Sequence, residues 1–352
     1  DLILKNYNTS SKKPYFVIRC ITQSHKGFGN INRCLIVSKL LTKKFQIVFV
    51  IEKNSKARQL ITKNGFVCKE LPEHIDGINY LENLHKKIHF PILLLDVRER
   101  GEFFAKKLRN KNFKLIQFDD AWCKNIFADI YFNGLPQKSE KSFVKKNPNA
   151  KIYAGSKFWI SDNNFYQYKK SMRSITNKHH YIITISLGGS DPKNLTALIL
   201  NAIASLENIT IYVIIGPFFN NVTSIKNFQN KNNIIIVKNN FSLWKIFQNS
   251  DVVICNAGNT VFDLMLQRVP TLSIPIVKHQ NQYSKFFHSR NLSVNLGIPS
   301  KLSNSKIRKS LDLILTNLTK RKELVKNSTL YFDGNGTSRV VSKILKSIKT
   351  KN

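Results

Sequence analysis

Short, continuously apolar segments alternate with longer amphipathic ones along this chain, and the alternation occurs twice. The first series places strands at 15–20, 46–51, 91–95 and 114–118, with helices at 31–43 and 56–64. A strand buried on both faces of a parallel sheet needs apolar residues on both sides, so a continuous apolar run is typical of it. Regular alternation of such strands with helices predicts an α/β fold whose helices cover both faces of the sheet.

The alternation breaks between residues 137 and 180, where the sequence is polar and basic, and then resumes. The second series has strands at 181–187, 211–215, 234–237, 252–255 and 271–274, helices at 195–206, 243–248 and 260–267, and a mostly helical end over 303–349. Open α/β sheets bind ligands at the carboxyl ends of their strands, so we predict two doubly wound, Rossmann-like domains facing a central cleft. The predicted parts are an N-terminal extension over 1–13, a first domain over 14–165, a linker over 166–180, a second domain over 181–336 and a C-terminal helix over 337–352.

Composition excludes several other classes of protein. Of the 352 residues 42% are hydrophobic, which is too many for a disordered chain. The five cysteines are odd in number and form no CxxC pair, so we expect neither a disulfide framework nor a zinc site. No apolar run approaches the roughly 18 residues of a membrane span. We therefore expect a cytoplasmic protein, and the first residue, Asp1, leaves open whether a segment precedes it.

The chain is strongly basic. It has 56 Lys and Arg against 21 Asp and Glu, a formal net charge of +35. Only 12 of these cations are Arg, and Asn and Ile are abundant, which favours an AT-biased coding sequence, because phosphate-binding proteins usually prefer Arg. The alternative is a selected anionic partner such as an acidic membrane, which would hold the protein at the inner membrane face. No DNA- or RNA-binding motif is recognisable, so no specific nucleic acid is expected.

Polar and glycine-rich turns follow several strands of the first series. Gly27 and Gly29 precede Asn30, where the first helix opens, and a helix N-terminus with glycines before it favours an anionic ligand. The alternative is a tight turn in which Asn30 caps the helix. Asp96 and the pair Asp119 and Asp120 end later strands, where carboxylates would act as base or sugar ligand, or else as turn and cap residues.

The second series carries comparable turns. The first holds Gly188, Gly189 and Ser190, then Asp191 before Pro192, which suits a helix N-cap, and then Asn194; the groups after the glycines would contact phosphate or sugar.

A second turn, Ala257, Gly258, Asn259 and Thr260, opens a helix that suits a diphosphate, and Asp263 lies one turn later, placed for ribose hydroxyls or for the helix dipole. Gln280 belongs to a polar cluster after a strand, which would contact a sugar or form a solvated loop.

Seven motifs in one order carry a resemblance to a known family. They are GFGNINR at 27–33, LLLDVRER at 93–100, QFDDAW at 117–122, ISLGGSDPKNLT at 185–196, CNAGNTVFDLMLQRVPTLSIP at 255–275, VNLG at 294–297 and FDGNGTSRVV at 332–341. Their order resembles the UDP-2,4-diacetamido-2,4,6-trideoxy-β-L-altropyranose hydrolases of pseudaminic acid biosynthesis. It looks even closer to the spore-coat polysaccharide "predicted glycosyltransferase" branch of that family. Both are similar to the peptidoglycan N-acetylglucosaminyltransferase, and all share the two-domain GT-B fold.

The resemblance implies a nucleotide-sugar enzyme of surface-glycan synthesis in bacteria, with a UDP-sugar as substrate. Gly188, Gly189 and Ser190 would face phosphate and sugar, Ala257 to Thr260 the diphosphate, and Asp263 the ribose. The helix dipole and backbone N–H groups would stabilise the leaving UDP, so the resemblance implies no metal or other cofactor. The first domain would present water or a sugar hydroxyl, with Asn30, Arg33, Asp96 and Asp120 as candidate residues.

The sequence departs from the hydrolase pattern at two positions. The hydrolases have Gly-x-Gly-His in the first loop, with that His as proposed base, and an aromatic residue where this chain has Arg98. Here Asn30 replaces the His, and an amide takes no proton from water. Asp263 matches the family's ribose-binding Glu. A hydrolase, a glycosyltransferase and an inactive nucleotide-sugar-binding homologue therefore stay open.

Overall fold

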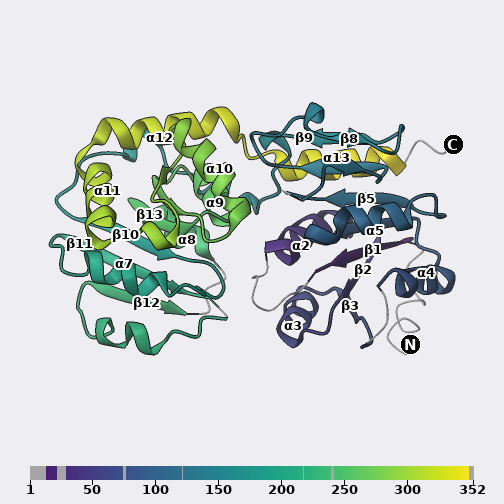
Figure 1. Cartoon of the computed structure of the whole chain (residues 1–352), viewed down its shortest axis with the longest axis horizontal. Helices are drawn as coiled ribbons and strands as arrows, with labels where there is room; N and C mark the ends of the chain where they lie inside the picture. Colours follow the sequence, from purple (N-terminus) through teal and green to yellow (C-terminus); the bar gives the residue numbers. More distant parts are fainter. Residues whose placement is uncertain are drawn as a thin grey trace.

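Two parallel β-sheets, one from each half of the chain, form the framework of the molecule (Figure 1). The computed structural model describes residues 13–21, 29–73, 77–120, 122–216, 218–238 and 242–348. The predicted α/β class with two such units is confirmed.

The elements of the first half are β1 (Tyr15–Cys20), α2 (Gly29–Leu41), β2 (Gln46–Ile51), α3 (Ser55–Lys63), β3 (Val67–Glu70), α4 (Gly77–Ile88), β4 (Ile92–Asp96), α5 (Gly101–Leu108), β5 (Lys114–Phe118), β6 (Asn125–Ile126), β7 (Ile130–Asn133), β8 (Val144–Lys145) and β9 (Lys151–Ala154). Those that follow are α6 (Asn163–Gln167), β10 (Tyr181–Ser186), α7 (Leu195–Ile203), β11 (Ile209–Ile215), β12 (Ile234–Lys238), α8 (Leu243–Asn249), β13 (Val252–Asn256), α9 (Asn259–Gln267), β14 (Thr271–Ile274), α10 (Lys278–Ser289), β15 (Val294–Asn295), α11 (Asn304–Thr316), α12 (Leu318–Tyr331) and α13 (Gly336–Ile348).

Both sheets have the strand order of a Rossmann fold. The first runs β3-β2-β1-β4-β5-β7-β9 and the second β12-β11-β10-β13-β14-β15, and every paired strand is parallel. In each sheet the order reverses at one place, between β1 and β4 or between β10 and β13. The loops after these strands diverge, which opens a crevice at their carboxyl ends.

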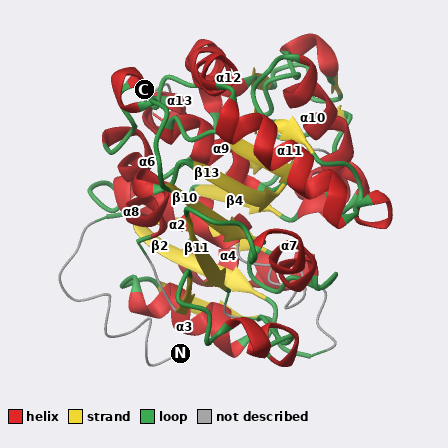
Figure 2. Cartoon of the chain, turned by 90° about the vertical axis from the view of Figure 1, so that its left-hand side faces the viewer, coloured by secondary structure: helices red, strands yellow, loops and turns green. Residues whose placement is uncertain are grey.

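Helices cover both faces of each sheet, which explains the continuous apolar runs. In β1, Phe16 and Ile18 pack in one core with residues of α2, α3 and α13, while Val17 packs in another with residues of α4 and α5. In the second sheet, α7 and α11 cover one face, and α8, α9 and α10 cover the other. Figure 2 views the molecule from the side of the second half and shows helices on either side of its strands.

The chain crosses between the two units twice. Phe158 packs in the first core, whereas the next residue, Trp159, packs in the second. Phe332 still belongs to the second core, and Val340 of α13 is back in the first. Figure 1 accordingly shows α13, in yellow, beside the strands of the first half.

The stretch predicted as a linker, 166–180, packs on the second unit. The ring of Tyr168 stacks on Trp244 with centroids 4.1 Å apart, and the backbone N–H of Lys170 donates to the carbonyl of Gln267. The exact domain boundaries stay predictions.

Several predicted elements differ in detail. The strands β3, β7 and β9 were not predicted, and the polar cluster 279–282, for which a solvated loop was one alternative, lies in the N-terminal part of α10. The predicted N-cap at Asp191 is wrong in position, because α7 begins at Leu195. The Asp191 carboxylate still accepts hydrogen bonds from the N–H groups of Leu195 and Thr196, at 2.9 and 2.8 Å. Among the described helices, none is long and apolar enough to cross a membrane.

Candidate active site between the two sheets

A buried arginine organises the first-half side of the crevice. Arg33 of α2 donates from Nε and Nη2 to the two oxygens of Asp96, at 2.6 and 2.7 Å, and from Nη1 to Oδ1 of Asp120, at 2.6 Å. Burial lowers the pKa of Arg33, the charges of Asp120 and Asp96 raise it, and the result lies well above the usual value. Three predicted residues from α2, β4 and the loop after β5 therefore form one ion-pair network.

The two carboxylates in this network differ in exposure. Asp96 is fully buried, whereas the Asp120 side chain is 27% exposed. Asp120 is therefore the carboxylate of the network that a ligand reaches. Its neighbour Asp119 is buried; burial and the Asp120 charge raise the pKa of Asp119 to about 6, although it accepts hydrogen bonds from Tyr131 and from the N–H of Cys123.

Asn30 lies between the Asp96 carboxylate and the Arg98 guanidinium. Its Nδ2 donates to Oδ1 of Asp96, and its Oδ1 accepts from Nε of Arg98 at 2.9 Å. Both ends of the amide are thus engaged, and the side chain is buried. The preceding glycine of the motif, Gly27, lies outside the described residues, as does His25.

One group of potential metal ligands lies here within the described part of the chain. The Sγ atoms of Cys20 and Cys34 and an oxygen of Asp96 lie within 4.8 Å of one another. The Arg33 guanidinium already spans both oxygens of Asp96, and burial raises the pKa of Cys34 well above its usual value. A protonated thiol and a paired carboxylate are poor metal ligands, so these residues do not fit a metal.

The two halves meet where two helices begin. A Cβ on Gly29, the first residue of α2, would lie 2.8 Å from Nδ2 of Asn259, the first residue of α9. A side chain at position 29 would therefore displace the Asn259 amide.

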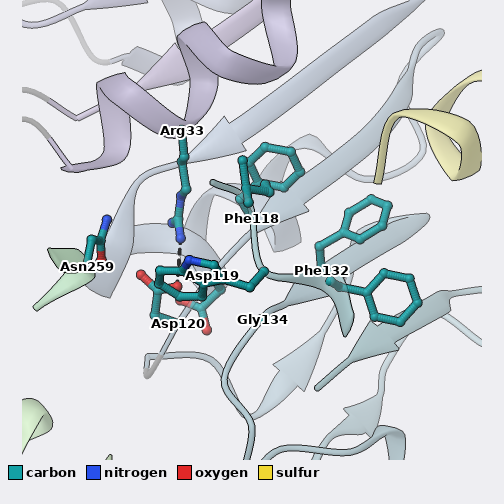
Figure 3. Close-up of a pocket in the computed structure, with 10 residues that line it drawn as sticks. Arg33, Phe118, Asp119, Asp120, Phe132, Gly134 and Asn259 are labelled. Atoms are coloured by element: carbon teal, nitrogen blue, oxygen red, sulfur yellow. Dashed lines mark hydrogen bonds and ion pairs between the residues drawn. The ribbon is translucent and has the colours of Figure 1, made fainter. Parts of the chain in front are cut away.

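Figure 3 shows Arg33 pointing from its helix toward Asp119 and Asp120, with Asn259 entering from the other unit. These residues line a small pocket open to solvent, whose lining also includes Trp159.

The turn after β10 is held by backbone and amide contacts. Gly188 has φ +84°, and a Cβ there would lie 2.8 Å from Nδ2 of Asn256. The carbonyl of Gly189 accepts from the N–H of Phe218, and Ser190 is partly exposed beside it. Asn194, also predicted to bind the ligand, is the N-cap residue of α7 in the left-handed region and accepts a hydrogen bond from Ser224 through Oδ1.

The turn before α9 offers fewer backbone donors than the sequence predicted. The N–H of Ala257 donates to the carbonyl of Ile274 at 2.8 Å, so Ala257 cannot donate it to a diphosphate as well. Gly258 is the N-cap of α9, and Asn259 and Thr260 are its first two residues. The N–H groups of a first helical turn lack partners within the helix and attract anions.

Asp263 follows one turn into α9. Its Oδ1 accepts a hydrogen bond from Oγ of Ser161 at 2.7 Å. The pKa of Asp263 is raised to about 7. Burial raises it most, the Ser161 hydrogen bond opposes the rise, and the Asp162 charge adds to it. No sequence signal pointed to Ser161, because the two residues are 102 positions apart.

Helix α10 adds residues near the same turns. Gln280 accepts from the N–H of Ile276 at 2.9 Å, and its Nε2 lies 3.5 Å from where a Cβ of Gly258 would be. Burial raises the pKa of Tyr283, as does the charge of Asp120, while Arg98 lowers it, and the result lies well above the usual value. The charge of the first-half acid Asp120 thus reaches Tyr283, a residue that sequence reasoning did not single out.

Known proteins match this chain over most of its length. An uncharacterized protein of Methanocaldococcus jannaschii, MJ1062, is 30% identical over 274 residues, 74% of this chain and 54% of that protein. The chain thus spans about half the length of this relative. The spore coat polysaccharide biosynthesis protein SpsG of Bacillus subtilis is 23% identical over 90% of this chain and 94% of its own length.

Solved structures show the same fold at low identity. MurG of Acinetobacter baumannii superposes with a TM-score of 0.69 at 15% identity, covering 95% of this chain and all of that one. Anabaena Alr3699/HepE, solved in complex with UDP-glucose, has a TM-score of 0.61 at 12% identity, covering 95% of this chain and all of that one. The predicted GT-B fold is confirmed. A family model, the glycosyltransferase family 28 C-terminal domain, matches residues 160–340, which is more than half of the chain. The chain therefore belongs to the family that this domain defines.

Proposed function

We propose that this chain transfers a sugar from a UDP-sugar to an acceptor hydroxyl in the synthesis of a surface polysaccharide. The observation that carries the proposal is that Asp120 of the first half and Asn259, at the start of α9, line one pocket. A reacting hydroxyl and a nucleotide diphosphate would then lie side by side. The relatives support this, since SpsG is named for spore coat polysaccharide biosynthesis and HepE was solved with UDP-glucose.

The nucleotide side would use α9. The N–H groups of Asn259 and Thr260 open that helix, and its dipole favours a diphosphate there. Asp263 lies one turn further along and would accept hydrogen bonds from the ribose hydroxyls. Gly188, Gly189 and Ser190, after β10, would face the sugar and phosphate. Backbone donors and a helix dipole would stabilise the departing UDP.

The acceptor side would use Asp120 as the base. The acceptor oxygen forms a bond to the anomeric carbon, the bond from that carbon to the diphosphate oxygen breaks, and UDP leaves with the electron pair. The acceptor proton passes to Asp120. Asp96 is a positioning residue in this proposal, since it is fully buried and Arg33 spans both of its oxygens.

A release assay tests the reaction. The protein is incubated with a panel of nucleotide sugars, with and without candidate acceptors, and UDP and free sugar are followed by mass spectrometry. Asp120→Asn should lower turnover by about 10²–10⁴ while leaving UDP affinity unchanged, as expected for loss of a base. Asp312→Asn, on α11, is the matched control and should change neither.

The assay also separates the rival functions. Full release of free sugar in water without an acceptor would identify a hydrolase. UDP binding with no turnover on any acceptor would identify a nucleotide-sugar-binding homologue. An unchanged melting temperature with UDP, CMP and GDP would reject the nucleotide-sugar proposal altogether. Vesicle sedimentation tests an acidic membrane as an additional partner, and equal recovery in the supernatant with neutral and acidic vesicles at low salt would reject it.

A further inference from the structure

The two segments that connect the units touch each other, and Ser161 and Thr337 form two hydrogen bonds where they meet. The N–H of Ser161 donates to Oγ1 of Thr337 at 3.1 Å, and that hydroxyl donates to the Ser161 carbonyl at 2.8 Å. A Cβ on Gly336 would lie 2.0 Å from the carbonyl oxygen of Trp159, so the chains meet backbone to backbone. The outgoing and returning segments are thus fastened together at the boundary between the units.

The same outgoing segment contacts two consecutive residues of α9. The ring of Trp159 stacks on Phe262, with centroids 3.7 Å apart and planes 13° from parallel. Two residues later, the Ser161 hydroxyl donates to the Asp263 carboxylate. The stack holds the segment against the helix, and the hydrogen bond fixes one carboxylate oxygen. Fixing Oδ1 of Asp263 also fixes the direction in which its Oδ2 can accept hydrogen bonds from a ligand.

We propose that Ser161 is a positioning residue of the nucleotide site, which orients the Asp263 carboxylate and ties it to the two connecting segments. The inference rests on the proposed function, in which Asp263 accepts the ribose hydroxyls. Ser161 itself need not touch the nucleotide. Through Thr337 it links the ribose carboxylate to the returning segment and so to α13, which packs on the first sheet.

The charge on Asp263 is what Ser161 affects chemically. Burial raises the pKa of this carboxyl to about 7, and the Ser161 hydroxyl opposes that rise by donating to the charged form. A carboxylate accepts hydrogen bonds from two hydroxyls better than a neutral acid does. Without Ser161, a larger fraction of Asp263 would be protonated at neutral pH, and ribose binding would need a higher pH.

The surrounding charges give Asp263 no other support. Asp162, next to Ser161, raises its pKa, and Cys255 of β13 has its own pKa raised by burial and by the Asp263 charge, so it stays a neutral thiol.

Two cations on helices packed against α9, Lys245 and Arg321, are engaged elsewhere. Lys245 of α8 lies over the Trp244 ring, and Arg321 of α12 donates to the carbonyls of Ile314 and Leu315.

The test compares UDP with 2′-deoxy-UDP on the whole protein. The quantity compared is the dissociation constant of 2′-deoxy-UDP divided by that of UDP. Both ligands carry the same terminal phosphate, which titrates with a second pKa of about 6, so its effect cancels in this ratio. Calorimetry at a series of pH values then reports the contact of the 2′-hydroxyl with the protein. In the wild type this ratio should rise as pH increases through about 7.

Ser161→Ala should move the midpoint of that rise to higher pH and lower the ratio about tenfold at neutral pH, which corresponds to one charge-assisted hydrogen bond. Ser161→Thr keeps the hydroxyl and should restore the wild-type profile. Ser328→Ala is the matched control, because its buried hydroxyl contacts the Met265 carbonyl of α9 but not Asp263. It should lower stability without moving the midpoint.

Each outcome decides one part of the inference. A Ser161→Ala profile that superposes on the wild type would overturn the positioning role, and so would a Ser328→Ala profile that shifts equally. Thr337→Val should move the midpoint in the same direction by a smaller amount, and no movement would refute the tie to the returning segment. If the wild type binds neither ligand at any pH, the proposed function fails instead.

Discussion

The two sides of the crevice give their acidic residues different partners. Asp96 of the first half is fully buried, and a guanidinium spans both of its oxygens. Asp263 of the second half is only partly buried, its hydrogen-bond donor is the hydroxyl of Ser161, and in the described part of the chain no cation lies within ion-pair distance. Both oxygens of Asp96 accept hydrogen bonds from a cation without any ligand. Asp263 has one hydroxyl donor and needs further donors to stabilise its charge.

This difference separates an internal framework from a binding surface. A buried carboxylate that is paired with Arg contributes order to its own domain, and removing one partner leaves a stranded charge. A buried carboxylate without a cation destabilises the free protein, and a ligand with hydroxyl donors relieves that cost. The contrast predicts opposite responses when each acid or its partner is changed.

The largest effect is expected from removing the first-half cation. Arg33→Met leaves Asp96 buried without its partner and should lower the free energy of unfolding by about 3–5 kcal/mol. The control is Arg58→Met, which breaks an exposed ion pair with Glu70, where the Arg58 side chain is 54% exposed; an exposed pair is worth about 0–1 kcal/mol. Urea unfolding of both variants measures the difference. Similar losses would mean that the Arg33 network is no more than a surface ion pair.

Neutralising the second-half acid should stabilise the free protein. The folded pKa of Asp263, about 7, lies above the unfolded value, so the folded state binds the extra proton and stability falls as pH rises from about 4 to about 7. Asp263→Asn removes this penalty and should raise the free energy of unfolding at pH 8 by on the order of 2–3 kcal/mol, with no gain near pH 4.

Asp96→Asn provides the comparison of sign at the same pH. It leaves Arg33 without its bidentate partner and should destabilise the protein where Asp263→Asn stabilises it. Unfolding of both variants at pH 8 and pH 4 without nucleotide measures this. A destabilising Asp263→Asn at pH 8 would show that this acid is a structural element like Asp96.

Nucleotide affinity should follow Asp263 closely. Two charge-assisted hydrogen bonds to a ribose are worth about 2–4 kcal/mol, so Asp263→Ala should largely abolish the rise in melting temperature caused by UDP. Asp251→Ala, which removes a carboxylate paired with Lys178 at the far end of β13, should keep most of that rise. A full UDP shift in Asp263→Ala would place the ribose elsewhere.

The sequence predicted those parts of the fold in which local pattern and burial agree. The strands β1, β2, β5 and β14 were found at the predicted residues, since each is an apolar run with helices on both sides. The strands β7 and β9 were missed because the described chain between β5 and α6 holds no α-helix, so both fall outside the strand–helix alternation on which the prediction rested. Strand β7 pairs with β5 and β9 with β7, and this pairing is decided by the sheet and not by their own sequence.

The candidate site was predictable by position but not by contact. Asp96 and Asp120 were expected at strand ends, and the structure brings them to Arg33. Arg33 pairs with both acids, of which Asp96 is buried and Asp120 is accessible. This difference depends on side-chain directions, which the spacing of residues in the sequence does not reveal. Ser161 carries no motif at all, and its place beside Asp263 follows from the path of the connecting segment.

The smallest effect is expected where this chain departs from the hydrolases. A His at position 30 would meet the acceptor oxygen of Asp96 on one side and the N–H of Arg98 on the other, as Asn30 does. The Arg98 donor would occupy the ring nitrogen that base catalysis needs. Asn30→His alone should therefore change UDP-sugar hydrolysis by less than about threefold, although a working base contributes about 10²–10⁴.

Combining that change with Arg98→Tyr removes the competing donor and restores an aromatic residue at that position. The double variant should raise hydrolysis by at least about tenfold, part of the range of a general base. UDP affinity should stay constant in both variants, because neither residue lies on α9. The measurement is free-sugar release in water at saturating UDP-sugar. A tenfold gain from Asn30→His alone would show that Arg98 turns away from this position and that the buried Asp96 network leaves room for a base.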